Sequence, residues 1–284
     1  MDLTSQIVLA MNTWLQTVSE QLLTPALSAV GQLLFATPAY DRITEVEHLW
    51  TVIRNAADAL FMLAIVAAGV LIMASGTFDS RYSAKVLLPR LLLAAVLANG
   101  SLAMVGALIR LNNAVVGALL DAESSGSVIG HLAATTAAHP VNLAIGSVVG
   151  LAAAALALLL LVLAIARAVL LLVATVLSPL ALAAYALPQT EELAHLWWRI
   201  YAALLFLQVV QALLVNLGLE LLRHTDWLGG PVSELTSGIL LVTLLYLLFR
   251  IPFAAYHWAF RQPVSHAAPV RYVLIAARAM AGGA

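Results

Sequence analysis

One nearly uncharged run dominates this sequence. Residues 141–187 read VNLAIGSVVGLAAAALALLLLVLAIARAVLLLVATVLSPLALAAYAL, and Arg167 is their only charged residue. About 20 apolar residues in a helix cross the hydrocarbon core of a bilayer, so this run is too long for one simple crossing. Two interpretations compete: two spans that turn tightly near Arg167, or one long span followed by a helix that breaks at Ser178-Pro179 and ends at Pro188. Both predict a membrane protein.

The composition of the whole chain supports this prediction. Of the 284 residues, 63% are hydrophobic and 10% are charged, whereas a typical soluble domain carries about 25% charged residues. The apolar excess is too large for one soluble core, so lipid must cover the rest. The formal net charge of −1 gives no basic field that would hold nucleic acid. We therefore predict an all-α fold, a polytopic transmembrane helix bundle.

The number of spans follows from the apolar runs on either side. These runs lie at 60–75, 86–109, 200–222 and 237–258. If 141–187 crosses once, the chain has about five spans, and 170–187 forms a re-entrant or interfacial helix; if it crosses twice, the chain has six. Asp41, which follows Thr37-Pro38, is expected to cap a helix that runs on into the first span.

The N-terminal part of the chain has a different pattern. Between residues 3 and 35, apolar residues recur at helical spacing while the opposite side is polar, which predicts an amphipathic helix at an interface or on the bundle. The expected organisation is therefore an N-terminal amphipathic helical region (1–40), a transmembrane bundle (41–258) and a basic cytoplasmic tail (259–284).

Charge asymmetry favours five spans, because cytoplasmic segments collect Lys and Arg. With five spans the N-terminus lies outside and the C-terminus lies in the cytoplasm, and the inside segments carry eight basic residues. These are Arg81, Lys85, Arg90, Arg167, Arg199, Arg261, Arg271 and Arg278. Outside lie Arg42, Arg54, Arg110 and Arg223. With six spans the tail, which has three arginines, would face outside and the asymmetry would weaken.

Signatures of enzymes are missing from the sequence. It contains no phosphate-binding G-x-x-x-x-G-K-[ST] loop, no H-E-x-x-H zinc motif and no G-x-S-x-G nucleophile turn. Cysteine is absent, and the seven histidines are scattered, so no metal site is expected. We predict no catalytic residue, no metal and no cofactor.

Polar residues inside the apolar segments are the remaining candidates for a functional role, because charge at bilayer depth is costly. Arg90, Arg167 and Arg250 lie near predicted inner boundaries, where their long side chains could reach the lipid headgroups. Gln208 and Gln211 are expected to hydrogen-bond to neighbouring helices rather than to line a water-filled path. A break at Ser178-Pro179 would free backbone carbonyls, which neighbouring protein or water must satisfy.

One segment resembles a known family. Arg167 is followed by an apolar run that ends in Ser178-Pro179-Leu180, then by Leu187-Pro188-Gln189-Thr190 and by Trp197-Trp198-Arg199 before the next apolar run. This order is similar to the central region of the TrbL/VirB-type polytopic inner-membrane channel subunits of type IV secretion systems, which serve conjugation and DNA transfer. The similar region covers roughly 167–211.

The resemblance implies a membrane channel or scaffold subunit that assembles as a ring in the cytoplasmic membrane. It implies a homo-oligomer in contact with lipid, with export ATPases and pilin, and with DNA or protein cargo in transit. The structural or channel candidates are Arg167, Ser178, Pro179, Pro188, Trp197, Trp198, Arg199, Gln208 and Gln211. The alternatives are a DNA-import channel subunit of a related system and a small-solute permease that works alone.

Overall fold

The computed structural model describes residues 29–74, 84–120, 143–223 and 232–261, with a few isolated positions between Gln6 and Pro25. Over these residues the protein is helical, without strands. Its long helices are α2 (Thr44–Ala74), α3 (Ala84–Leu119), α5 (Leu143–Val176), α7 (Glu191–Arg223) and α8 (Val232–Arg261). Shorter elements are η1 (Tyr40–Arg42), α6 (Ser178–Ala183) and η3 (Ala184–Ala186). The predicted all-α fold is confirmed for this part of the chain.

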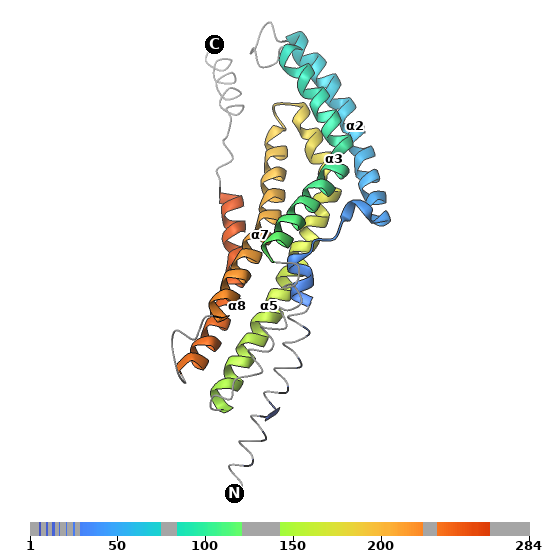
Figure 1. Cartoon of the computed structure of the whole chain (residues 1–284). Helices are drawn as coiled ribbons and strands as arrows, with labels where there is room; N and C mark the ends of the chain where they lie inside the picture. Colours follow the sequence, from blue (N-terminus) through green and yellow to red (C-terminus); the bar gives the residue numbers. More distant parts are fainter. Residues whose placement is uncertain are drawn as a thin grey trace, which may run out of the picture.

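The long helices form an elongated bundle (Figure 1). Helices α5, α7 and α8 pack on one another, and α2 and α3 form an antiparallel pair toward one end, where α6 and η3 pack against them. Four helices contain apolar stretches long enough to cross a membrane: Thr44–Val70, Leu87–Leu119, Leu151–Val176 and Glu191–Gly218. Helix α8 contains a shorter apolar stretch, Ile239–Ala254. The protein is therefore a multi-pass membrane protein.

Helix α5 decides between the two interpretations of the long apolar run. It is one continuous helix from Leu143 to Val176, so the chain does not turn near Arg167 and the interpretation with two spans meeting there is wrong. The helix ends just before Ser178-Pro179, where α6 begins. Arg167 consequently lies within a membrane helix, and counting it among the residues of an inside loop was also wrong.

The start of α2 differs from the expectation in one respect. The helix does run unbroken into the first apolar stretch, but its first hydrogen bonds are accepted by Ile43 O, so Asp41 does not cap it. Asp41 lies in η1 and forms an ion pair with Arg110 of α3, with 2.5 Å between Oδ2 and Nη1. Gly106 makes this approach possible, because a Cβ at that position would lie 2.3 Å from Asp41 Oδ2.

Small residues on α5 determine how closely the other helices approach. Its buried face is rich in alanine, and Leu241, Leu244, Leu245 and Leu248 of α8 pack against Ala153, Ala154, Ala157 and Ala164. Such flat faces allow the close contact on which helix association in a membrane depends. A second cluster forms around Trp197, Tyr201 and Leu182, where α5, α6 and α7 meet.

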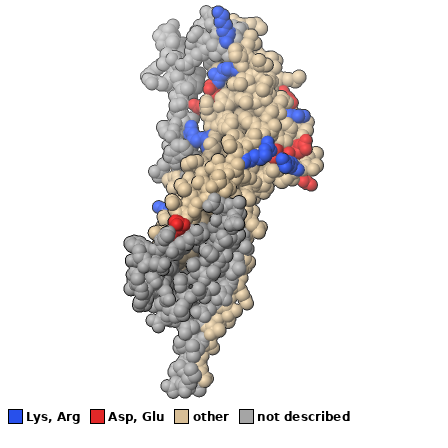
Figure 2. All heavy atoms as spheres, in the orientation of Figure 1, with Lys and Arg blue, Asp and Glu red and all other residues tan. Residues whose placement is uncertain are grey.

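The outer surface is largely apolar. Side chains such as Met62, Val66, Val162 and Phe206 are well over half exposed, as expected for residues that face lipid. In Figure 2, the charged side chains of the described residues gather in the upper half of the molecule, and its lower right edge is uncharged. The predicted basic tail beyond Arg261 and most of the predicted N-terminal amphipathic helix lie outside the described residues.

Candidate functional site

A buried arginine lies at the junction of the helices. Arg167 of α5 is only 4% exposed. Its Nη1 donates to Leu34 O at 3.1 Å, and its Nη2 donates to Thr37 Oγ1 at 2.9 Å and to Gln208 Oε1 at 2.5 Å. These acceptors come from the segment before α2 and from α7, so the guanidinium group links three parts of the chain that are distant in sequence. In each of these three bonds an uncharged oxygen accepts from the positively charged guanidinium group of Arg167.

Gln208 is the centre of the same network. Its Oε1 accepts hydrogen bonds from Thr37 Oγ1 at 2.8 Å and from Asn112 Nδ2 at 2.8 Å, as well as from Arg167. Its Nε2 donates to Phe35 O at 2.9 Å. A side chain with this many partners in a low-dielectric interior has one favoured orientation. Gln208 therefore fixes the relative positions of α3, α5, α7 and the segment before α2.

The segment before α2 is held at two more points. Thr37 N donates to Asn113 Oδ1 at 3.1 Å, and Asn113 Nδ2 donates to Thr37 O at 2.8 Å. The hydroxyl group of Tyr40 donates to Ala168 O at 2.9 Å. We call Arg167, Gln208, Thr37, Asn112 and Asn113 the arginine clamp. It satisfies the backbone of a non-helical stretch that would otherwise carry unpaired polar groups in an apolar environment.

These contacts test two interpretations from the sequence. The side chain of Arg167 does not reach the lipid headgroups; it is buried, and that interpretation is wrong. The expectation that Gln208 and Gln211 hydrogen-bond to neighbouring helices is confirmed, since Gln211 Nε2 donates to Leu248 O of α8 at 3.5 Å. Leu248 O is the carbonyl freed by Pro252, which lies inside α8 and has no N–H to donate.

The break after α5 is stabilised by an aromatic residue of α7. Ser178 and Pro179 begin α6 and are buried. Trp197 Nε1 donates to Ala174 O at 2.9 Å, and this carbonyl belongs to the last turn of α5, which lacks a continuing helix to satisfy it. Trp197 also stacks on Tyr201, with ring centroids 5.0 Å apart and 16° between the planes. The freed backbone group is thus paired within the protein.

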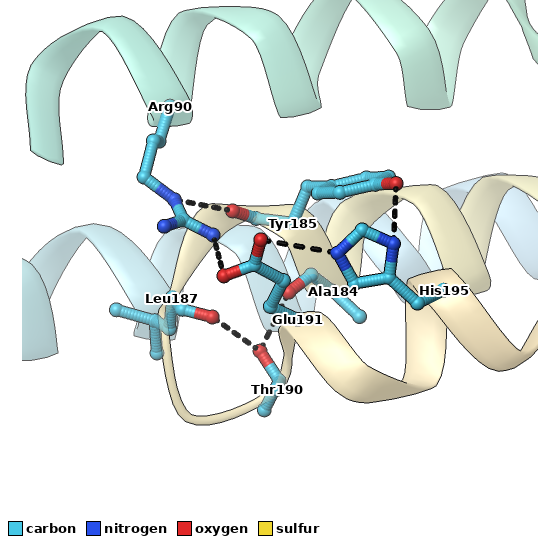
Figure 3. A network of polar contacts seen from close by, with 7 residues as sticks. All are labelled: Arg90, Ala184, Tyr185, Leu187, Thr190, Glu191 and His195. Atoms are coloured by element: carbon cyan, nitrogen blue, oxygen red, sulfur yellow. Dashed lines mark hydrogen bonds and ion pairs between the residues drawn. The ribbon is translucent and has the colours of Figure 1, made fainter. Parts of the chain in front are cut away.

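The turn between η3 and α7 contains Pro188 and is closed by a hydroxyl group. Leu187, just before the proline, is extended, as residues before proline prefer. The Oγ1 of Thr190 bonds to Ala184 O at 2.7 Å and to Leu187 O at 3.2 Å, as Figure 3 shows. The Leu-Pro-x-Thr sequence therefore acts as a tight connection that starts α7 at Glu191.

Arg90 of α3 joins this turn to the neighbouring helix (Figure 3). Its Nη2 lies 2.5 Å from Glu191 Oε2, and its Nε donates to Tyr185 O at 3.4 Å. His195 Nε2 lies 3.1 Å from Glu191 Oε1. Arg90 is thus engaged by protein while its side chain stays partly exposed, and the interpretation that it reaches the headgroups stays a prediction. Burial and the nearby Glu191 carboxylate raise the pKa of Tyr185, while Arg90 opposes them.

A small cavity lies beside the clamp. Its volume is about 120 Å³, and it is lined by Arg167, Gln211, Pro252 and apolar side chains.

The rings of Trp198 and Trp197 meet edge-on, with their centroids 5.2 Å apart. Arg199, which follows it, is half-buried and takes no part in the described bonds of the clamp. The structure therefore unites Arg167 with Gln208, and Ser178 and Pro179 with Trp197, but leaves Arg199 apart.

The sequence did not single out the remaining members of the clamp. Thr37, Asn112 and Asn113 were absent from the candidate residues. Two adjacent asparagines next to an apolar run are a usable signal, because amides in membrane helices hydrogen-bond to neighbouring helices.

Within the described residues, no three His, Asp or Glu side chains cluster as metal ligands would. The hydrogen-bonded side chains of the clamp can hold segments of the chain in place, which is a structural role.

Comparison with known proteins agrees with the motif. A family model described as "TrbL/VirB6 plasmid conjugal transfer like protein" matches residues 1–284, so the similarity extends well beyond 167–211. Neither a curated protein nor a solved structure matches the chain.

Proposed function

Because the chain belongs to the TrbL/VirB6 plasmid conjugal transfer-like family, we propose that it is a channel or scaffold subunit of a type IV secretion-like machine. In this role it assembles as a ring in the cytoplasmic membrane and helps DNA or protein to cross. The observation that carries the proposal is the match of the family model over the whole chain, including every described membrane helix. The function is structural, and we expect no catalytic residue and no cofactor.

The proposed topology has five crossings, with α8 as the fifth. Its apolar stretch, Ile239–Ala254, is 16 residues long and needs flanking side chains to complete the crossing. The re-entrant or interfacial helix, predicted over 170–187, is shorter in this topology and consists of α6 and η3, because residues 170–176 belong to α5. The N-terminus lies outside and the C-terminus lies in the cytoplasm. The bundle is 41–258, between an amphipathic region (1–40) and a basic tail (259–284).

Cysteine labelling tests this topology, because the natural chain has no cysteine. In Met280→Cys, a membrane-impermeant maleimide should label the tail in opened vesicles but not in intact cells. Ready labelling in intact cells would place the tail outside and would exclude five crossings with the N-terminus outside.

The proposed role of the helix break is to shape the subunit. In Pro179→Leu the α5 helix can continue past Val176, which would move α6 away from α3. We expect DNA transfer between cells to fall at least tenfold while the amount of protein in the membrane stays normal. Pro263→Leu, in the predicted tail, is the matched control and should transfer DNA normally. If the Pro179 variant transfers DNA as well as the wild type, the helix break has no part in the proposed function.

Purification from membranes tests the proposed assembly. The subunit should elute in mild detergent as a homo-oligomer together with the export ATPases and pilin of its machine. A monomer or dimer that lacks these partners and carries a small solute into liposomes would instead identify a permease that works alone. Transfer measured separately in donor and recipient cells distinguishes export from DNA import.

A further inference from the structure

The cavity beside the clamp has an open side that faces lipid. Its walls come from α5, α7, α8 and the segment before α2. Two lining residues of α5, Ala166 and Leu170, are exposed, whereas Gln211 of α7 and Pro252 of α8 are buried. Ala166 and Leu170 belong to the apolar stretch Leu151–Val176, so the open side meets hydrocarbon. A ligand of this cavity would enter it from the membrane.

The side chain of Gln211 gives the cavity an acceptor that needs a donor. Gln211 is only 2% exposed, and its Nε2 donates to Leu248 O at 3.5 Å. This bond fixes the orientation of the amide, because Pro252 leaves Leu248 O without its helical donor. The Oε1 of Gln211 is buried and accepts no hydrogen bond from the part of the chain that the structure describes. An unpaired acceptor in apolar surroundings is costly, so binding of a donor there is favourable.

The rest of the wall restricts what can carry this donor. Apart from Arg167 and Gln211 the lining side chains are apolar, which suits water poorly, since a buried water needs two to four polar partners. A cavity of about 150 Å³ can hold benzene, so the volume of about 120 Å³ suits one small ring. The guanidinium group of Arg167 lies in the wall, and a cation attracts the face of an aromatic ring.

We propose that this cavity binds a small phenol that is dissolved in the membrane. The ring fills the apolar part of the cavity beside Arg167, and the hydroxyl group donates to Gln211 Oε1. The bound ring would contact α5, α7 and α8 together and so connect α8 to the clamp. This inference does not depend on the proposed function, because one copy of the chain forms the whole site.

Binding of fluorinated probes tests the site in the full-length protein. We would compare 4-fluorophenol with fluorobenzene by ¹⁹F NMR in lipid nanodiscs, and subtract their partition into empty nanodiscs. The wild type should bind 4-fluorophenol at least tenfold more tightly than fluorobenzene. Cyclohexanol, which has the hydroxyl group but no aromatic face, should compete at least fivefold more weakly than phenol. Competition by 4-octylphenol tells whether a ligand with a tail can also occupy the site or only a free phenol can.

Two variants separate the hydroxyl group from the ring. Gln211→Leu keeps the size of the side chain, and it should weaken 4-fluorophenol binding at least tenfold while fluorobenzene binding changes less than threefold. Ala166→Leu puts a larger side chain at the open side and should weaken the binding of both probes at least tenfold. Ala155→Leu is the matched control, since Ala155 is an exposed alanine of α5 that does not line the cavity; it should bind both probes as the wild type does.

Four results would overturn the inference. Equal binding of the two probes by the wild type would mean that Gln211 does not recognise the hydroxyl group. Unchanged 4-fluorophenol binding in Gln211→Leu or in Ala166→Leu would place the ligand elsewhere. Equal competition by cyclohexanol and phenol would exclude an aromatic ligand. A wild-type protein that binds neither probe beyond the partition into empty nanodiscs would refute the site altogether.

Discussion

Replacing Gln208 by leucine is the most direct test of the arginine clamp. The change keeps the size and removes five hydrogen bonds: three accepted by Oε1, one of them from Arg167, and two donated by Nε2, to Phe35 O and to Asn113 Oδ1. In membrane proteins such bonds contribute about 0.6 kcal/mol each on average, up to about 1.7. The bond from the charged guanidinium is among the stronger ones. We expect the free energy of unfolding to fall by about 3 kcal/mol.

The assay is unfolding by SDS titration in mixed micelles, followed by the fluorescence of tryptophan. Gln211→Leu is the matched control, since it makes the same change on the same helix but removes a bond of 3.5 Å to Leu248 O. We expect its cost to stay below about 1 kcal/mol. Limited proteolysis should also cut the segment 36–43 faster in the Gln208 variant, because this variant releases the segment before α2.

Equal losses in the two variants would refute the reasoning. So would additive losses in a double-mutant cycle with Arg167→Leu, because residues of one hydrogen-bonded network should couple by about 0.5–3 kcal/mol. Unchanged cleavage of 36–43 together with lower stability would mean that Gln208 acts through packing rather than through the clamp.

Two further variants test local contacts. Trp197→Phe leaves the carbonyl at the end of α5 without its donor, so the free energy of unfolding should fall by about 1–2 kcal/mol; Trp198→Phe is the control, and equal losses in the SDS titration would contradict the assigned bond. Gly106→Ala places a methyl group against the Asp41 carboxyl and should cost about 1–3 kcal/mol. Gly100→Ala, which has open space beside it, should be neutral or stabilising by up to about 1 kcal/mol, and thermal unfolding in detergent should rank the two glycine variants in that order.

The sequence predicted the fold class because its long uncharged apolar runs are a strong signal of a membrane protein. Long uncharged runs can be stable only in hydrocarbon, and their lengths and positions give the helices with errors of several residues at the ends. Residues 200–222 were expected as a span, for example, whereas α7 begins earlier, at Glu191. Ser178, Pro179 and Pro188 were also visible, since proline interrupts helices wherever it occurs.

The candidate residues were predicted less completely. Arg167 and Gln208 were singled out because polar groups in apolar segments are rare, but their direct contact was not foreseen. Arg90 and Arg167 were expected to reach the lipid headgroups, because both lie near predicted span boundaries and arginine has a long side chain. The structure shows that Glu191 engages the first and that oxygens of the segment before α2 engage the second.

The sequence by itself determined that this chain is a helical, multi-pass membrane protein of the conjugal-transfer type, because apolar run length and a local motif are properties of neighbouring residues. Only the tertiary structure decided which polar groups meet. Thr37, Asn112, Arg167 and Gln208 lie on four separate segments, and a hydrogen bond depends on their separation in space, which side-chain packing sets. The same holds for Arg250, since its exposure on α8 is defined only once the other helices have taken their places.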